Sequence, residues 1–468
     1  MKSKKINNSL ERLFEQRLSS FLNPKHPLFQ LSDSIPFHSL ASDLDRGFSY
    51  GPGQPPLPIR LIIGLLIISH MYNISDEQVV VRWVENPYWQ YFCGYDYFQF
   101  KMPCNPSSLT RWRHRLGQEG LNKILSMTID LALKKKVLTR KELEKVIADT
   151  TVMEKNIRYP TDSSLLNKSR EKLVSIAKKT GIKLRQTYQR LGLSIKRKVD
   201  CYAHAKQYKR LSKGIKTLKT YLGRVVRDVE RSIQSSDDLI RNQFTNLLSI
   251  SKKLINQSKK SKDKIYSIHE PSVYCVSKGK SKHPYEFGCK VQFTVTHKKG
   301  LIVSTEAIHP NAYDGHTLQK SLLQAEQLSG TKVKYAFVDK AYRGNNIPVS
   351  ECNIFISGSK RGITPALKKA IKRRSSIEPH IGHMKSDGKL SVNYLKGILG
   401  DKLNVILCAI AHNLRLITRK LFLTHSQSHK LKTYIIKILN PKPVIPISWV
   451  GKIERLLNHK YCKKRSIQ

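Results

Sequence analysis

Acidic residues are scarce in this chain. Its 468 residues include 34 Asp and Glu but 84 Lys and Arg, which gives a formal net charge of +50 at pH 7. Positive charge in such excess repels itself unless a polyanion neutralises it. DNA or RNA is the favoured polyanion, because Lys and Arg displace the counterions condensed on phosphates. An anionic membrane surface is the weaker candidate, since we find no lipidation motif at either end.

Long hydrophobic runs are also missing. The most apolar run, Leu61–Ile68, has eight residues, whereas a membrane-spanning helix needs about 20. The basic segment Met1–Asn7 is not followed by an apolar signal core with a cleavage site. With 40% hydrophobic residues, the chain can still build a core. We therefore expect a folded cytoplasmic protein and no membrane partner.

Paired cysteines are the third absence. The eight cysteines stand at positions 93, 104, 201, 275, 289, 352, 408 and 462, and none forms a Cys-x-x-Cys pair. In a chain this long, such scattering predicts reduced, buried thiols rather than a disulfide framework or a zinc knuckle. We therefore expect no metal bound through sulfur.

Composition divides the chain into six predicted parts. They are an N-terminal extension (1–56), a helical DNA-binding region (57–140), the first part of an α/β core (141–160), a basic helical insertion (161–266), the second part of the core (267–425) and a basic C-terminal tail (426–468). The extension ends in Gly51–Pro56, a cluster that is typical of a loop.

The region 57–140 contains two helix start signals. Ser75–Gln78 has the pattern of a capping box, and Asn105 precedes a basic, aromatic segment. This segment carries three arginines: Arg111, Arg113 and Arg115. They fit the second helix of a helix-turn-helix protein, which enters the major groove of DNA. A solvated basic helix face beside a structural Trp112 explains the same residues equally well.

The predicted insertion differs in kind from its surroundings. Residues 161–264 contain 27 Lys and Arg against 8 Asp and Glu. Leu, Ile and Val recur there at helical spacing, which predicts long amphipathic helices with basic outer faces. Because solubility alone does not require one sign of charge, a nucleic-acid-binding face is favoured over a neutral solvated one.

Strand patterns flank the insertion. Strands are expected at 145–153, 273–276, 286–296 and 301–308, the last two joined by a hairpin turn at Lys298–Gly300. Further elements are expected as a helix at 315–328, strands at 333–339 and 354–356, a basic helix at 365–384 and apolar helices at 403–423. Antiparallel strands followed by strands alternating with helices predict an α/β fold, a mixed sheet with helices on its faces.

Two aspartates, Asp149 and Asp339, stand inside or at the end of apolar strands. A buried carboxylate is costly unless it is paired or bound to a metal. For either residue alone, pairing with a Lys or Arg, or capping of the strand end, is an equally good explanation.

Glu378 is a third candidate carboxylate. Helical spacing puts Arg374 and Lys385 on its face, although an ordinary surface ion pair has the same pattern. Because Pro379 removes a helical hydrogen bond, either Glu378 lies in a first turn capped by Ser375 or Ser376, or the helix kinks there. Three carboxylates that converge from two strands and a helix suit a site for two Mg²⁺ ions acting on a phosphodiester.

With these residues the chain resembles the DDE-type transposases of bacterial insertion sequences. The resemblance extends over most of the chain, through the segments 58–113, 148–152, 311–318, 338–344 and 395–404. The family signature Tyr-x2-Arg-x3-Glu-x6-Lys is matched at Arg374, Glu378 and Lys385. Its tyrosine, a phosphate contact in the family, is replaced by Ile371.

The resemblance implies an RNase H-like core, with Asp149 on its first strand, Asp339 at the end of its fourth and Glu378 on a late helix. These carboxylates would be the catalytic residues and would bind two Mg²⁺ ions, with Mn²⁺ as a substitute. The partner would be double-stranded DNA, as terminal inverted repeats and target, bound by a homodimer or larger assembly. The residues expected to contact DNA are Arg374, Lys385, Arg343, Arg111, Arg113 and Arg115.

The implied activity is cleavage at element ends by water, followed by attack of the freed 3′-hydroxyl on target DNA. Two other functions stay open: a nuclease that cuts without joining, and a non-catalytic DNA-binding remnant of a mobile element. His309, Asp314 and His316 are a second candidate metal cluster. This cluster is disfavoured, because the run resembles the stretch that follows the third strand in the family.

Overall fold

The structure is a computed structural model that describes residues 15–45, 57–234, 236–258, 260–277, 284–344, 347, 351–358 and 363–439, with side chains up to residue 420. The predicted loop at Gly51–Pro56 and residues 440–468 of the predicted tail lie outside this range. The chain divides by its internal contacts into two units, residues 1–416 and 417–468. The sheet, the site and the clusters described below all belong to the first unit.

The N-terminal part is helical, as predicted. Its elements are α1 (Leu18–Phe21), α2 (Pro27–Ser34), α3 (Phe37–Asp45), α4 (Ile59–Met71), α5 (Asp76–Glu85), α6 (Pro87–Phe92), α7 (Pro106–Lys134) and α8 (Arg140–Leu143). The predicted capping box at Ser75 is present at the start of α5, and the side chain of Asn105 caps α7. At Gly117, where φ is +61°, α7 has a non-helical residue that kinks it.

Helix α4 is largely apolar, and all of its residues from Leu61 to His70 are buried. Within the described residues, we find no single helix long and apolar enough to cross a membrane. Helices α4 and α5 together are long and apolar enough to do so, but they are bent by 107° relative to each other.

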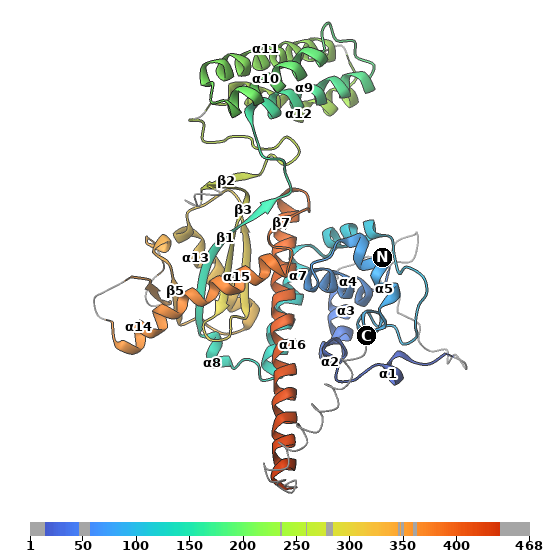
Figure 1. The fold of residues 1–468 in the computed structure, drawn as a ribbon, viewed down its shortest axis with the longest axis vertical. Coiled ribbons are helices and arrows are strands. Elements are labelled where there is room, and N and C mark those ends of the chain that lie inside the picture. The colour runs from blue at the N-terminus through green and yellow to red at the C-terminus, as the bar shows by residue number, and fades with distance from the viewer. Residues whose placement is uncertain are drawn as a thin grey trace, which may run out of the picture. The chain divides into compact units, whose positions relative to one another are not determined.

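A seven-stranded mixed sheet forms the core (Figure 1). Its strands are β1 (Lys145–Lys155), β2 (Tyr274–Ser277), β3 (Tyr285–Thr296), β4 (Ile302–Ile308), β5 (Tyr335–Val338), β6 (Asn353–Ile356) and β7 (Val392–Asn393). β3 pairs antiparallel with β1, β2 and β4, whereas β5 is parallel to both β1 and β6, and β7 is parallel to β1. The predicted mixed α/β architecture is therefore confirmed, including the hairpin turn, where Gly300 has a φ of +69°.

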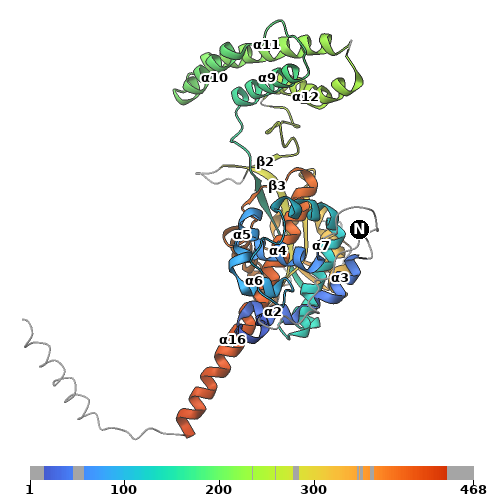
Figure 2. The same ribbon diagram turned by 90° about the vertical axis from the view of Figure 1, so that its right-hand side faces the viewer.

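Helices cover both faces of this sheet. Neighbouring residues on β1 point to opposite faces: Thr150 donates to Asp314 at the start of α13 (Asp314–Ser329), whereas Asp149 accepts from Arg374. Helix α15 (Ile377–Ser386) therefore lies on the face opposite to α13. The first part of α16 (Gly397–Leu439) lies on the same face as α15, because Asn404 donates to the sulfur of Met153 on β1. Helices α4 and α7 lie beside it (Figure 2), where His70 and Thr128 contact Asn404 and Asn413.

Two predicted boundaries are wrong. The basic helix expected at 365–384 is broken into α14 (Pro365–Lys372), the 3₁₀ turn η2 (Arg373–Ser376) and α15. The predicted boundary between the core and the C-terminal tail, at 425/426, falls inside α16. Helix propensity does not end where the composition changes, and the sequence has neither Gly nor Pro between Asp401 and Asn440, so nothing local stops this helix.

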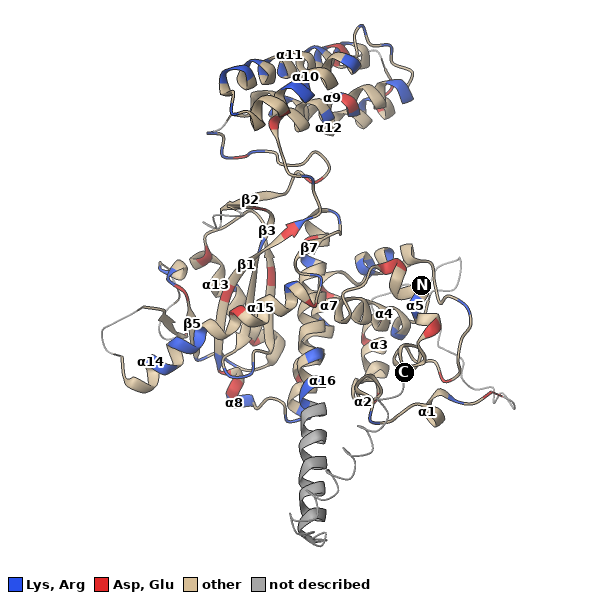
Figure 3. Ribbon diagram, in the orientation of Figure 1, with Lys and Arg blue, Asp and Glu red and all other residues tan. Residues whose placement is uncertain are grey.

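The predicted insertion is a group of four helices around its own apolar core. Its helices are α9 (Asp162–Lys179), α10 (Gln189–His204), α11 (Tyr208–Ile233) and α12 (Asp238–Asn256). The core includes Leu173, Leu222 and Phe244, each fully buried. Lys and Arg are spread along α10 and α11 with few acidic residues between them (Figure 3). The sequence thus predicted the amphipathic pattern correctly.

Candidate active site

The parallel pairing of β1 with β5 brings Asp149 and Asp339 together. Ile147 pairs with Phe337, and the two aspartates stand two residues further along their strands. Asp149 lies within β1, and its Oδ1 accepts a hydrogen bond from the backbone N–H of Thr150 at 2.8 Å. Asp339 follows β5 directly, and the register alone makes the two carboxylates neighbours.

The strand before Asp339 differs in number from the expectation. β5 is the fifth strand in chain order, whereas the resemblance implied the fourth. The additional strand is the short β2, which pairs antiparallel with β3. Asp339 caps the 3₁₀ turn η1 (Lys340–Tyr342), where its Oδ1 accepts from the backbone N–H of Lys340 at 2.7 Å. This contact fixes the carboxylate at the strand end.

Glu378 lies in the first turn of α15, which is one of the two arrangements that Pro379 allowed. Ser376 occupies the N-cap position, but its side chain makes no capping hydrogen bond. The 3₁₀ turn before α15 carries Arg374, four residues ahead of Glu378. The break in the predicted helix therefore lies at the residues that line the site.

The guanidinium of Arg374 contacts all three predicted carboxylates. Its Nη2 lies 2.7 Å from Oδ2 of Asp149 and 3.5 Å from Oδ2 of Asp339. Its Nη1 lies 3.7 Å from Oε1 of Glu378. The side chains of Arg374 and Asp149 are 14% and 16% exposed, whereas Glu378 is 63% exposed. The cluster therefore opens to solvent on the side of α15.

The charges in this cluster do not balance. Burial raises the pKa of Asp149, and the negative charges of Asp339 and Glu378 raise it further, while Arg374 and the Thr150 N–H act in the opposite direction. Three carboxylates share one guanidinium, so the four side chains carry an excess of negative charge. Such a group attracts further cations.

The donor atoms suit a hard divalent cation. Carboxylate oxygens are the protein ligands that Mg²⁺ prefers, and each of the three residues has an oxygen that faces Arg374. By themselves, these oxygens do not all lie within 4.8 Å of one another in the part of the chain that the structure describes. Asp149, Asp339 and Glu378 are the residues that would hold divalent ions in the place of the guanidinium, with their oxygens closer together than they lie in this structure.

The other predicted DNA contacts lie on several elements. Arg111 and Arg115 are exposed on α7, and the guanidinium of Arg115 lies 4.7 Å from the ring centre of the buried Trp112. Arg343 is exposed directly after η1, and Lys385 is half-buried near the end of α15. Contacts between these four residues and DNA stay predictions.

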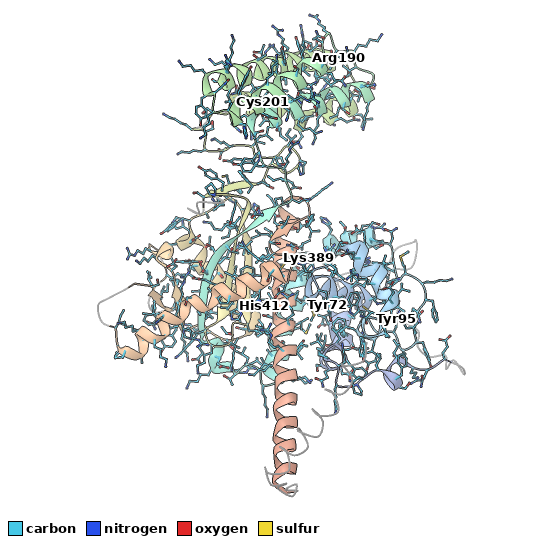
Figure 4. The ribbon with its side chains drawn as sticks, viewed as in Figure 1. Tyr72, Tyr95, Arg190, Cys201, Lys389 and His412 are labelled. Carbon is cyan, nitrogen blue, oxygen red and sulfur yellow. The ribbon has the colours of Figure 1, made fainter. Side chains whose placement is uncertain are left out.

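Arg113 has a different environment from its neighbours. It is 2% exposed, and its two terminal nitrogens donate to the two carboxylate oxygens of Asp76 at 2.5 and 2.6 Å. Lys389, labelled in Figure 4, lies 3.9 Å from the same carboxylate. The guanidinium of Arg113 is thus turned into the protein, which corrects the expectation that it reaches DNA. Helical periodicity turns it away from the exposed Arg111 and Arg115.

Sequence reasoning missed the groups that support the carboxylates. The hydroxyl of Ser357, after β6, donates to Oδ1 of Asp339 at 3.3 Å. On the opposite face of β1, Asp314 accepts from Thr150 at 3.1 Å and pairs with Lys290 at 2.9 Å. No local pattern marks Ser357, because it meets Asp339 only through the parallel pairing of β5 with β6. His309, Asp314 and His316, the disfavoured second cluster, do not bring their donor atoms within 4.8 Å of one another in the described part of the chain.

Comparison with known proteins defines the class: the chain belongs to a transposase family. Residues 16–115, which include α1 to α6 and the first part of α7, match a transposase domain (DUF772). The chain is similar to the uncharacterized protein ORF8 in the nfe locus of Rhizobium meliloti, with 42% identity over 196 residues. That alignment covers 42% of this chain and 94% of the relative. No solved structure matches the chain.

Proposed function

We propose that this protein is a DDE-type DNA transposase, in which Asp149, Asp339 and Glu378 are the catalytic residues. The observation that carries the proposal is the convergence of these three side chains on the guanidinium of Arg374. They come from two parallel strands and a helix that lie up to 229 residues apart in the chain. The mixed sheet, with Asp149 on its first strand, supports an RNase H-like core.

The three carboxylates would hold the metal ions of this reaction. When bound, two Mg²⁺ ions, or Mn²⁺ in their place, would activate the attacking oxygen and stabilise the leaving oxygen. Arg374 would then leave the carboxylates, because bound metal would take up their charge. Its freed guanidinium is suited to a DNA phosphate, since Arg binds phosphate through two parallel hydrogen bonds. Lys385, two helical turns beyond Glu378, adds a second positive charge.

Double-stranded DNA is the proposed partner, both as element ends and as target. The net charge of +50 supports it, because each phosphate contact releases condensed counterions. The exposed Arg111 and Arg115 and the basic insertion offer binding faces. Because two ends must be held together during transposition, we propose a homodimer or larger assembly, located in the bacterial cytoplasm with the nucleoid.

The test uses a duplex that carries an inverted repeat from the DNA flanking the coding region, a target plasmid and Mg²⁺. Cleavage and joining are followed on gels for the full chain, for Asp339→Asn and for Asp387→Asn. Asp387 is the matched control: it is an aspartate at the C-cap of α15, outside the carboxylate cluster. We expect Asp339→Asn to bind the duplex as the unchanged protein does but to cut none of it, whereas Asp387→Asn cuts and joins normally.

Each alternative gives its own result in this assay. Cleavage without any joined product identifies a nuclease that lacks strand transfer. Binding without cleavage by the unchanged protein identifies a non-catalytic remnant. Equal cleavage by the unchanged protein and Asp339→Asn rejects the carboxylate site itself.

A further inference from the structure

A second group of metal-binding side chains lies apart from the three carboxylates. It consists of Cys289 on β3, His309 directly after β4 and Asp401, the fifth residue of α16. One donor atom from each residue lies within 4.8 Å of the other two. Cys289 pairs with Met153, further along β1 than Asp149, so this group is separate from the candidate active site.

All three side chains are removed from solvent. Cys289 is 2% and Asp401 4% exposed, and the side chain of His309 is 7% exposed. Nδ1 of His309 has no hydrogen-bond partner among the described residues, and Nε2 lies 3.2 Å from Oδ2 of Asp401. Buried polar atoms in proteins are normally hydrogen-bonded. A buried imidazole that has one ring nitrogen without a partner and the other facing a carboxylate, beside a thiol, is arranged as a metal ligand would be.

The neighbouring charges leave one carboxylate oxygen available. Oδ1 of Asp401 lies 2.7 Å from Nζ of Lys155 and accepts a hydrogen bond from Asn393 at 2.7 Å. The same lysine lies 3.3 Å from Oε2 of Glu270. The second oxygen, Oδ2, faces His309. Burial would raise the pKa of Asp401, but the contacts with His309, Lys155 and Asn393 outweigh it and keep this pKa below its usual range.

Charge balance favours a divalent ion at this position. One lysine faces two carboxylates in the group, which leaves one negative charge. Metal binding releases the proton of the Cys289 thiol, whose pKa burial otherwise raises, because the thiolate is the form that binds metal. The group then carries two uncompensated negative charges, and a divalent cation neutralises both.

We infer that Cys289, His309 and Asp401 bind one zinc-class divalent transition-metal ion, which links the sheet to the start of α16. Sulfur, imidazole and carboxylate together are a donor set for Zn²⁺, whereas Mg²⁺ takes oxygen ligands. Donor atoms of a tetrahedral zinc site lie about 3.5 Å apart, close to the 3.2 Å between His309 Nε2 and Asp401 Oδ2. Water completes the coordination. The sequence pointed to His309 as a candidate ligand, but no metal bound through sulfur was expected, because Cys289, His309 and Asp401 are scattered over more than a hundred residues.

Cobalt binding tests the inference on the full chain. The protein is treated with a chelator and titrated with Co²⁺, whose complexes with thiolates have a sulfur-to-metal charge-transfer band in the near ultraviolet. We expect this band to saturate at one Co²⁺ per chain, and Zn²⁺ to displace the Co²⁺. Cys289→Ser should abolish the band, whereas Cys352→Ser, which alters another buried cysteine, should keep it.

Two further variants make the result decisive. His309→Gln keeps the thiol, so we expect it to weaken Zn²⁺ binding by more than about 100-fold, measured by competition with a metal-binding dye. Asp339→Asn should keep the charge-transfer band, which separates this site from the proposed Mg²⁺ site. If Cys289→Ser does not fold by circular dichroism, His309→Gln decides. The inference is wrong if the unchanged protein binds Co²⁺ without the band, or if His309→Gln binds Zn²⁺ as tightly as the unchanged protein.

Discussion

Arg374 and Asp149 are 225 residues apart in the sequence, and the guanidinium of one lies 2.7 Å from the carboxylate of the other. Arg374 was expected to contact DNA. In the structure it neutralises part of the charge of the three carboxylates instead. The two roles are compatible if the guanidinium exchanges its carboxylate partners for a phosphate, and this exchange has consequences for stability.

The first prediction concerns Arg374→Gln. Without the guanidinium, the three carboxylates repel one another, so we expect the free energy of unfolding without divalent ions to fall by about 2 kcal/mol. Mg²⁺ should restore more stability in the variant than it adds to the unchanged protein. Thermal unfolding with and without Mg²⁺ measures both effects.

The neighbouring arginine supplies the control for this experiment. Arg373 donates to the backbone carbonyls of His297 and Lys298 rather than to a carboxylate. Arg373→Gln should therefore respond to Mg²⁺ as the unchanged protein does. An equal response by Arg374→Gln would contradict the proposed exchange.

The second prediction concerns the buried pair of Arg113 and Asp76. Arg113→Met leaves the carboxylate of Asp76 with Lys389, 3.9 Å away, as its remaining charged partner among the described residues. Removing one member of a buried pair costs about 3 kcal/mol or more. We expect this loss in chemical unfolding, and replacing both residues with apolar ones should recover part of it. A stability change below about 0.5 kcal/mol would mean that the pair is not structural.

The third prediction concerns Arg111, which is exposed on the same helix. Arg111→Ala should leave stability unchanged and weaken DNA binding at low salt. The slope of log affinity against log salt should become shallower by about 0.9, because one phosphate contact is lost. Arg111→Lys keeps the charge and should keep the slope. Equal slopes for the alanine variant and the unchanged protein would exclude Arg111 from the DNA contact.

The fourth prediction concerns pH and His412, a buried residue on α16 that is labelled in Figure 4. Burial and the nearby His380 lower its pKa from 6.5 to about 3, while its Nε2 lies 3.1 Å from the carbonyl oxygen of Gly300. The unfolded chain takes up this proton near pH 6.5 and the folded protein does not. Stability is therefore complete above pH 6.5 and is lost as the pH falls towards 3, by about 1.4 kcal/mol per unit.

The measurement compares the unchanged protein with His412→Gln in chemical unfolding from pH 7 to pH 4. Glutamine can donate to the Gly300 carbonyl but does not titrate, so the variant should lose less stability on acidification. His114→Gln, at an exposed histidine of α7, should follow the unchanged protein. Parallel pH curves for His412→Gln and the unchanged protein would show that His412 is not the responsible group.

Much of the secondary structure could be predicted, because its causes are local. Period-two patterns predicted β1, β3 and β4, and helical spacing predicted that the insertion is helical, although not its division into four helices. The break at Arg373–Ser376 was not predicted, although Pro379 pointed to an irregularity near Glu378. A helix start that depends on packing against the sheet leaves no strong signal in a run of Lys, Arg and Ser.

The amino-acid sequence by itself determined the strands and helices, the excess of positive charge and the spacing of Arg374, Glu378 and Lys385. Only the tertiary structure decided which side chains meet: strand register joined Asp149 to Asp339, a helix turn buried Arg113 beside Asp76, and α16 carried Asp401 to His309. The reason is physical. Local propensity acts over a few residues, whereas contacts between distant residues depend on how strands pair and helices pack.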